Sequence, residues 1–410
     1  GPWRRVAVVG AGYAGMAAAV TLAERGVPVT VFESGPVPGG RARRVTTEGR
    51  ELDNGQHILI GAYTELLRLM RVVGVQSDAV LRLPLELRYA DGFALRSLWF
   101  PAPFGLLGGL FFSGKIPLRE RIGAVRFMFI LRSTGFRVEP KLSVKDLLDQ
   151  HGQNGVIGHY LWRPLCVSAL NTPPELASAQ VFVTVLRDSL AGQSDASDLL
   201  LPCVDLSQLF PEPAAGFVRS HGGEIRLNET VRDLASLQEE FPKIIVAVGP
   251  HQLKTLLPGL APEFEYQPIY TCYLQYPDSV KLPFPMLGLA GGLVQWAFDR
   301  GALSGEKGRI ACVISAQGDH QQMQQDELAA ACHRELARAL RGLPDPEWSR
   351  VIAEKRATVA CTPAMKAFNP KSSIPGVVLA GDYTDPDYPP TLEAAVRSGT
   401  RAALNIITEE

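Results

Sequence analysis

The feature that most constrains the fold is a short strand that runs straight into a glycine-rich turn. Val6–Val9 is apolar and β-branched, which is typical of a buried parallel strand. A GxGxxG pattern follows, in which Gly10 permits a tight turn, Gly12 lets the backbone approach a pyrophosphate and Gly15 lets a helix pack closely on the strand. The alanine-rich segment after it predicts a helix that ends at Gly26.

An acidic residue follows at the position that a dinucleotide-binding unit requires. Val27–Phe32 is predicted as the second strand, and Glu33 stands at its end. A carboxylate about twenty residues past the turn can accept hydrogen bonds from a ribose diol. The N-terminus of the helix presents free N–H groups and a positive dipole to the phosphates. The unit predicts dinucleotide binding, but by itself it does not separate NAD from FAD.

Composition limits the classes of partner. The 410 residues are long for one core, so we expect two substructures. With 46% hydrophobic residues, 20% charged residues and a net charge of −1, the chain lacks the overall basic charge of a nucleic-acid-binding protein. This net charge does not exclude a local basic patch. None of the six cysteines has metal-ligand or CxxC spacing, so we predict no metal site and reduced, mostly buried thiols, with a structural disulfide as the alternative. No signal peptide is predicted ahead of the first strand.

Motifs at both ends of the chain resemble one large group of flavoproteins. Gly39-Gly40-Arg41 is similar to the GGR element of the group that contains amine oxidases and carotenoid desaturases. The strand at 376–380, the Gly381-Asp382 pair and the helix beginning near Thr391-Leu392 are similar to the C-terminal flavin motif of that group. Between them, a strand near 224–227, then Val231, and a buried strand at 244–248 ended by Gly249 match its middle segment. The resemblance implies FAD as the cofactor.

The fold expected from this resemblance is α/β, with a discontinuous Rossmann-like FAD-binding domain and a second, mixed α+β substrate domain of the amine oxidase/phytoene desaturase type. We expect residues 1–84, 204–261 and 356–410 to form the FAD-binding domain. Residues 85–203 and 262–355 should form the substrate domain. No second GxGxxG follows, so an external electron donor is expected to reduce the flavin.

A narrower resemblance lies at residues 52–63. The string LDNGQHILIGAY is similar to the signature of the squalene-associated FAD-dependent desaturase family, which includes bacterial hydroxysqualene dehydroxylases, and residues 381–393 and 354–358 also resemble that family. The resemblance implies that the chain removes the hydroxyl of hydroxysqualene, a C30 allylic alcohol, with hydride from N5 of reduced flavin, to give squalene for hopanoids. An isoprenoid desaturase is the nearest alternative. An amine oxidase and a prenyl-binding carrier without flavin chemistry are weaker ones.

The site residues follow from these motifs. For catalysis we predict His57, Asp385 and Tyr388 as candidate proton donors; burial would favour this role at Asp385 and Tyr388, because it raises the pKa of a carboxyl or phenol. The alternatives are a packed histidine, a turn-forming aspartate before Pro386, and a tyrosine that only packs on the flavin. The predicted cofactor-binding residues are Gly10, Gly12, Ala14, Gly15, Glu33, Gly39, Gly40, Arg41, Gly55, Gln56, Val231, Gly249, Gly381, Asp382, Thr391 and Leu392.

One further segment suggests a membrane surface. Residues 98–112 are almost wholly apolar but too short and proline-broken to span a bilayer, and 116–131 has helical periodicity. Basic residues gather around this helix against few acids: Lys115, Arg119, Arg121, Arg126, Arg132, Arg137, Lys141 and Lys145. A basic segment with an apolar face favours membrane docking through residues 98–132, and a helix that only covers the substrate cavity is the alternative. We therefore expect a cytoplasmic protein, peripheral on the inner face of the bacterial plasma membrane.

Overall fold

The computed structural model describes residues 5–39, 44–47, 50–53, 56–96, 109, 114–190, 195–259, 261–363 and 369–409. Three predicted cofactor-binding residues, Gly40, Arg41 and Gly55, lie outside the described residues, as does nearly all of the apolar stretch at 98–112. The remaining predicted site residues are described.

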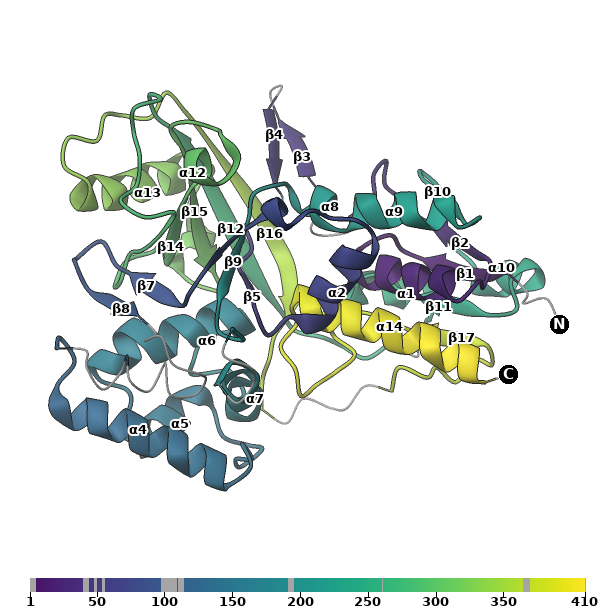
Figure 1. The fold of residues 1–410 in the computed structure, drawn as a ribbon, viewed down its shortest axis with the longest axis horizontal. Coiled ribbons are helices and arrows are strands. Elements are labelled where there is room, and N and C mark those ends of the chain that lie inside the picture. The colour runs from purple at the N-terminus through teal and green to yellow at the C-terminus, as the bar shows by residue number, and fades with distance from the viewer. Residues whose placement is uncertain are drawn as a thin grey trace.

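A five-stranded parallel sheet brings together three distant parts of the chain. Its order is β10-β2-β1-β11-β17, and every adjacent pair is parallel. The strands are β1 (Val6–Val9), β2 (Val29–Phe32), β10 (Glu224–Arg226), β11 (Ile244–Val246) and β17 (Val377–Leu379). The four strands other than β10 are fully buried and, apart from Thr30 in β2, apolar, as is typical of strands covered on both faces. The first, middle and last segments of the chain therefore share one sheet, at the right of Figure 1.

Two helices from opposite ends of the chain pack tightly on one face of this sheet. They are α1 (Tyr13–Glu24) and α14 (Leu392–Thr408), which lie side by side in Figure 1. Their contact requires a glycine, because a Cβ at Gly399 would lie 2.1 Å from the carbonyl oxygen of Ala14. α2 (Thr64–Val72), α8 (Leu206–Leu209) and α9 (Pro211–Ser220) complete the apolar core on this face. α10 (Leu234–Glu240) and α11 (Pro250–Leu256) contribute to the core on the other face.

A second sheet forms the centre of the other half of the molecule. It is antiparallel, with the order β13-β14-β15-β12-β16. The strands are β12 (Tyr266–Gln275), β13 (Met286–Gly288), β14 (Trp296–Asp299), β15 (Arg309–Ser315) and β16 (Trp348–Val359), with α12 (Arg300–Ser304) between β14 and β15. α13 (Gln325–Ala339) packs into one apolar cluster of this sheet. Figure 1 places the sheet at upper left.

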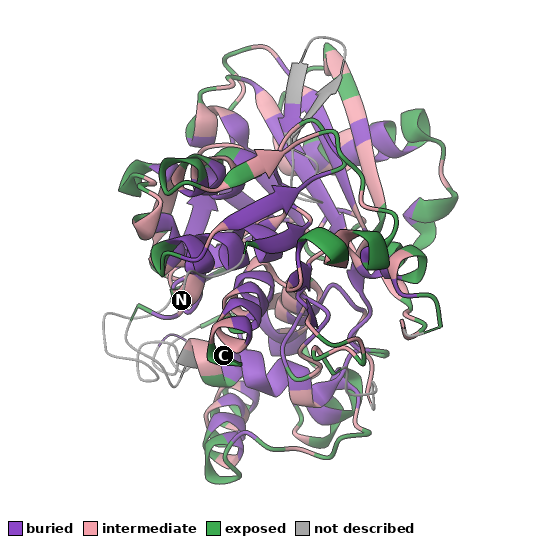
Figure 2. Ribbon diagram, turned by 90° about the vertical axis from the view of Figure 1, so that its right-hand side faces the viewer, coloured by how far each residue is buried: buried purple, intermediate pink, exposed green. Residues whose placement is uncertain are grey.

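A group of helices meets the other face of this antiparallel sheet. It comprises α4 (Leu118–Ser133), α5 (Val144–Gln150), α6 (Arg163–Leu170) and α7 (Ala179–Leu190), with a π-helical turn at Gly158–Trp162 before α6. Trp162, Phe127 and Phe182 lie at the centre of their core, which also includes Trp296 and Phe298 of the sheet. The helices lie at lower left in Figure 1. Figure 2 shows the buried strands at the centre and exposed helical turns outside.

Short strands connect the two halves. β9 (Leu199–Pro202) pairs with β5 (Leu59–Ile60) and β6 (Val80–Leu83), and β7 (Glu86–Arg88) forms a hairpin with β8 (Ala94–Arg96). β3 (Arg44–Thr47) and β4 (Arg50–Asp53) form another hairpin. Two of the expected domain limits do not follow this pairing. The limit after residue 355 falls inside β16, which stays paired with β12 up to Val359, and β9 pairs with strands that were expected in the other domain.

Several local expectations are confirmed. The Val6–Val9 strand has its predicted bounds, α1 ends at Glu24, and Gly26 has a positive φ of 74°. The helix expected at 116–131 is α4. All six cysteines are free thiols, five of them buried and Cys203 partly buried. Within the described ranges, no helix has both the length and the apolar character that crossing a bilayer would require.

Candidate active site

One cavity of about 1180 Å³ lies between the two halves and joins nearly all of the predicted site residues. Of the predicted residues that the structure describes, two are not part of its lining. These are Gly15 and Asp385. The predicted residues that do line it are Gly10, Gly12, Ala14, Glu33, Gly39, Gln56, His57, Val231, Gly249, Gly381, Asp382, Tyr388, Thr391 and Leu392. The motifs from the start, middle and end of the chain therefore converge on one space.

The N-terminus of α1, where the pyrophosphate is predicted to bind, opens onto this cavity. Its N-cap is Gly12, and none of the described side chains caps it or places an acid in its first turn. Gly10 has a φ of 108°, and a Cβ there would lie 2.6 Å from the carbonyl oxygen of Ala247. At Gly15 a Cβ would lie against the carbonyl oxygen of Gly10, so this residue serves the helix–turn contact. The N–H groups and the positive dipole at the N-terminus of a helix fit a pyrophosphate.

Glu33 holds the glycine-rich turn in shape. Its buried carboxylate accepts hydrogen bonds from the backbone N–H of Ala11 at 2.8 Å and of Gly35 at 3.0 Å. Each carboxylate oxygen can accept a further hydrogen bond, because an ionised carboxylate has about four lone-pair sites. The predicted contact of Glu33 with a ribose diol is therefore compatible with this geometry and stays a prediction.

The C-terminal motif places the start of α14 at the cavity. Thr391 is the N-cap of α14, and its Oγ1 accepts from the N–H of Ala394 at 3.1 Å. Gly381 has a φ of 158°, and its N–H donates to the Oγ of Ser398 at 2.8 Å, which fixes the preceding strand end on the helix. The dipole of α14 is thus directed toward the space where the flavin ring is predicted.

Glu393 is a fully buried residue that the sequence did not single out. Its carboxylate accepts from the backbone N–H of Glu65 at 3.2 Å and of Leu66 at 2.8 Å, at the N-terminus of α2. Arg397 Nε donates to the same carboxylate at 2.8 Å. This network ties α2 to α14 beside the cavity.

The predicted proton donors differ in their surroundings. Tyr388 is buried, and the guanidinium of Arg397 lies 4.5 Å from the centre of its ring. Burial raises the pKa of Tyr388 above its usual value, so the phenol keeps its proton. His57 is half-buried and lines the cavity. Asp385 instead accepts from the N–H of Asp387 at 3.0 Å, which is the turn contact that the sequence offered as its alternative.

Gln56 is held by a buried arginine from the other half of the molecule. Arg300 Nη1 donates to Gln56 Oε1 at 2.6 Å, and Arg300 Nε pairs with Glu306 at 3.2 Å. Arg300 is only 4% exposed. This contact links the predicted flavin turn to α12. Because 244 residues separate the two partners, no local spacing could have indicated it.

Beyond the flavin motifs the cavity wall is mainly apolar. Its side chains come from β7, the π-helical turn, the helices α6 and α7 and the inner face of the antiparallel sheet. They include Leu87, Leu161, Leu165, Val185, Leu186, Ile269, Met286, Trp296, Phe298 and Val313. A few polar residues interrupt it, among them Ser168, whose hydroxyl accepts from Trp296 Nε1 at 3.1 Å. Such a space suits a long apolar ligand next to a cofactor. The sequence predicted a substrate domain but none of these residues.

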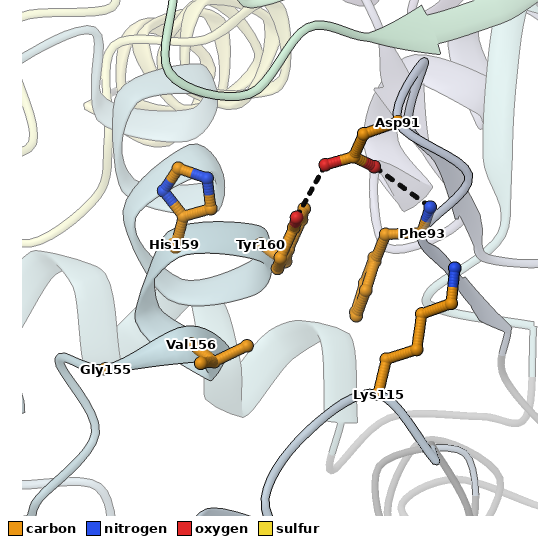
Figure 3. Close-up of a pocket in the computed structure, with 7 residues that line it drawn as sticks. All are labelled: Asp91, Phe93, Lys115, Gly155, Val156, His159 and Tyr160. Atoms are coloured by element: carbon orange, nitrogen blue, oxygen red, sulfur yellow. Dashed lines mark hydrogen bonds between the residues drawn. The ribbon is translucent and has the colours of Figure 1, made fainter.

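A second cavity of about 540 Å³ shares no lining residue with the first. It lies between the β7–β8 turn and the π-helical turn (Figure 3). Tyr160 donates to Asp91 Oδ2 at 2.5 Å and stacks on Phe93, with ring centres 3.9 Å apart. The hydrogen bond to Asp91 raises the pKa of Tyr160 to about 12. None of the predicted cofactor-binding or catalytic residues lines this cavity, so it is separate from the predicted flavin site.

Comparison with known proteins agrees with this geometry. The chain is 28% identical to hydroxysqualene dehydroxylase of Sinorhizobium fredii, over 99% of both chains. It is 29% identical to hydroxysqualene dehydroxylase of Rhodopseudomonas palustris, over 98% of this chain and 97% of the relative. Zeta-carotene desaturase of Arabidopsis thaliana is 22% identical over 99% of this chain and 86% of the relative.

Solved structures show the same fold. An oxidoreductase from Methanosarcina mazei superposes with a TM-score of 0.73 at 13% identity, covering 98% of this chain and 100% of the other. Cyclohexylamine oxidase from Brevibacterium oxydans superposes with a TM-score of 0.68 at 17% identity, covering 100% and 99%. Residues 13–407 match the family model for flavin-containing amine oxidoreductases. The chain therefore belongs to the family of flavin-containing amine oxidoreductases and is an FAD-dependent oxidoreductase.

Proposed function

We propose that this enzyme removes the hydroxyl group of hydroxysqualene reductively to give squalene. The observation that carries the proposal is the mainly apolar cavity, which extends from the predicted flavin residues to the antiparallel sheet. Three relatives with 25–29% identity over nearly the whole chain are hydroxysqualene dehydroxylases, which supports the same reaction here. In the balanced reaction, the alcohol, a proton and reduced flavin give the hydrocarbon, water and oxidised flavin.

FAD, when bound, would supply the hydride from N5 of its reduced ring. The protein has three tasks around it. The turn at Gly10–Gly15, Glu33 and the start of α14 would hold the cofactor. Leu161, Trp296 and the other apolar side chains would fold the isoprenoid chain against the ring and keep bulk water from the allylic cation.

A proton donor must turn the hydroxyl into a leaving water molecule. Tyr388 and His57 are the two predicted donors that line the cavity. Tyr388 keeps its proton, because burial raises its pKa, and we propose it as the first candidate. The carboxylate of Asp385 already accepts the hydrogen bond from the N–H of Asp387 that closes a local turn, so we rank Asp385 below both. Tyr388→Phe should lower the rate of product formation about 100-fold or more while leaving FAD bound. An unchanged rate would transfer the role to His57.

The function can be tested under anaerobic conditions with a single turnover. The protein is reduced with dithionite, mixed with hydroxysqualene, and followed by flavin absorbance and lipid analysis. Reoxidation of the flavin in step with the appearance of squalene would support the proposal. A flavin that stays reduced beside intact alcohol would overturn it.

Desaturation is the second candidate, because zeta-carotene desaturases align over nearly the whole chain at 21–23% identity. The opposite experiment distinguishes it from dehydroxylation. Oxidised protein is mixed with squalene or a carotenoid precursor without oxygen. Reduction of the flavin together with a product that has lost two hydrogens would favour the desaturase.

We further propose that α4 rests on an anionic membrane surface, which would place this enzyme at the inner face of the bacterial plasma membrane. Leu118, Ile122 and Phe129 are each more than half exposed on α4. At about 100° per residue they form one stripe along the helix. Exposed arginines flank the stripe at Arg126 and Arg132. An apolar stripe with basic flanks is the pattern of a helix that lies in the headgroup region.

Vesicle sedimentation tests this contact with a matched control. The triple variant Leu118→Ser, Ile122→Ser and Phe129→Ser should lose binding to phosphatidylglycerol-containing vesicles. The control is Leu176→Ser, because Leu176 is also an exposed leucine, 42% accessible, but lies outside α4. Binding should also weaken with salt, since the arginines act on the anionic surface. Equal binding by the triple variant and the control would refute the contact.

A further inference from the structure

One carboxylate stands in the apolar wall of the main cavity. Val185, Leu186, Asp188 and Ser189 of α7 all line this space. Asp188 lies in the last turn of the helix, where a negative charge opposes the helix dipole. Helix stability therefore does not account for an aspartate at this position.

The hydrogen bonds of Asp188 are incomplete. Its Oδ1 accepts from Arg187 Nε at 3.1 Å, an exposed contact between neighbours in sequence. Its Oδ2 is shielded from solvent, and none of the described residues donates to it. A buried carboxylate oxygen without a donor is costly, because it has lost water without gaining a partner. Asp188 is itself part of the cavity wall, so a rotation of its carboxylate would let this oxygen accept from a ligand that carries an O–H or N–H group.

Asp188 also lies near the C-terminal flavin motif. Burial is the largest cause of the raised pKa of Tyr388, and the charge of Asp188 contributes to it. The same charge acts on Arg397, which lies over the Tyr388 ring. The carboxylate is therefore near the side chains that precede and begin α14, at the end of the cavity where the flavin ring is predicted. If the reacting carbon of a substrate lies against that ring, the hydroxyl on the same carbon must lie near Asp188.

We propose that Asp188 recognises the hydroxyl of the isoprenoid alcohol by accepting its hydrogen bond, and so selects the alcohol over a hydrocarbon. The inference rests on the proposed function and assigns the substrate's polar group to a particular residue. The bond orients the C–O group beside the flavin and leaves the apolar chain to the rest of the wall. A hydrocarbon of the same length offers no donor, so it would leave the carboxylate unpaired, and a site built for a hydroxyl rejects such an analogue.

Binding to the oxidised holoenzyme tests the inference without turnover, because oxidised flavin has no hydride to deliver. The affinities of hydroxysqualene and of squalene are measured in detergent micelles through the flavin absorbance change. The variants are Asp188→Leu, which keeps the branched shape and removes both acceptor oxygens, and Asp188→Asn, which keeps the size and one acceptor oxygen. Arg187→Gln is the matched control, since it changes only the exposed partner of Oδ1.

We expect wild-type protein to bind the alcohol at least about 10-fold more tightly than squalene, the worth of one hydrogen bond to a charged group. Asp188→Leu should weaken binding of the alcohol about 10- to 100-fold and bind squalene at least as tightly as the wild type, because no unpaired carboxylate remains, and this binding also shows that the variant is folded. Asp188→Asn should fall between Asp188→Leu and wild type, and Arg187→Gln should match wild type.

Three results would overturn the inference, and they differ in what else they affect. If the wild type prefers the alcohol and Asp188→Leu keeps that preference, Asp188 is not the recognition group, while the proposed function stands. If the wild type binds both lipids equally, neither Asp188 nor any other residue selects the hydroxyl in the oxidised protein. Failure of the wild type to bind either lipid would overturn the proposed function together with the inference.

Discussion

The contact between α1 and α14 gives a sharp prediction, because it depends on the missing side chain of Gly399. In Gly399→Ala the new Cβ would lie 2.1 Å from the carbonyl oxygen of Ala14 and 3.0 Å from the Cβ of Ala17. Ordinary contact needs about 3.4 Å, so the two helices must part by about 1.3 Å. Overpacking costs about 1–3 kcal/mol, and a clash with backbone belongs at the upper end. Alanine regains about 1 kcal/mol of helix propensity, which leaves a net loss of about 2 kcal/mol.

The displaced helix is the one whose N-terminus is predicted to bind the pyrophosphate. If about 1.4 kcal/mol of the strain acts on the bound state, the dissociation constant for FAD should rise about 10-fold. Thermal melting of the protein and fluorescence titration of the apoprotein with FAD measure the two effects.

The same substitution elsewhere in the chain serves as the control. Gly216 is an exposed residue inside α9, and a Cβ there meets nothing within 4 Å. Gly216→Ala should therefore stabilise the protein by about 0.5–1 kcal/mol and leave FAD affinity unchanged. If Gly399→Ala melts at or above the melting temperature of Gly216→Ala, the contact between α1 and α14 does not require a glycine at position 399.

Three further predictions follow from buried polar groups. Glu393→Ala leaves the N-terminus of α2 and Arg397 without their acceptor. It should lower the free energy of unfolding, measured by urea denaturation, by about 3–5 kcal/mol. A loss below about 1 kcal/mol would show that water replaces the carboxylate. Arg300→Met removes the donor to Gln56 and should lower the free energy of unfolding by about 1–3 kcal/mol and weaken FAD binding. Unchanged FAD affinity would mean that Gln56 does not need this partner to hold the cofactor. Stability should be full below pH 10 and fall as the pH rises above it, because burial raises the folded-state pKa of several tyrosines above the unfolded value of about 10. Melting curves and phenolate absorbance across the alkaline range check this, and ionisation at pH 10 without loss of stability would contradict it; the tyrosines are Tyr63, Tyr89, Tyr276 and Tyr388.

The parts of the fold that the sequence predicts are those with local causes. The strand at Val6–Val9, the glycine-rich turn and the end of α1 at Gly26 each follow from a few adjacent residues, and the structure confirms them. The last strand and helix were predicted on the same local pattern and are β17 and α14. Their meeting with β11 in one sheet required the family resemblance, because parallel neighbours so far apart leave no mark in local periodicity.

The substrate side of the cavity was beyond such reasoning. Trp296, Met286 and Leu161 come from elements that are distant in sequence, and each looks like any other core residue until the fold brings them together. The acceptor at Asp188 stands in the last turn of α7, with no motif around it. The expected limit at residue 355 missed the end of β16, because a long strand that pairs with β12 shows no change of composition there. Gly40, Arg41 and Gly55 stay predictions from the flavoprotein resemblance.

Tracing the hydride shows whether the flavin itself reduces this substrate. The protein is reconstituted with reduced 5-deaza-FAD in which both hydrogens on C5 are deuterium, a position that does not exchange with water. It is then mixed with hydroxysqualene under anaerobic conditions, and the lipid is analysed by mass spectrometry. The account predicts squalene with one deuterium at the carbon that carried the hydroxyl. Unchanged alcohol, or squalene without deuterium, would contradict direct reduction of this substrate at the flavin.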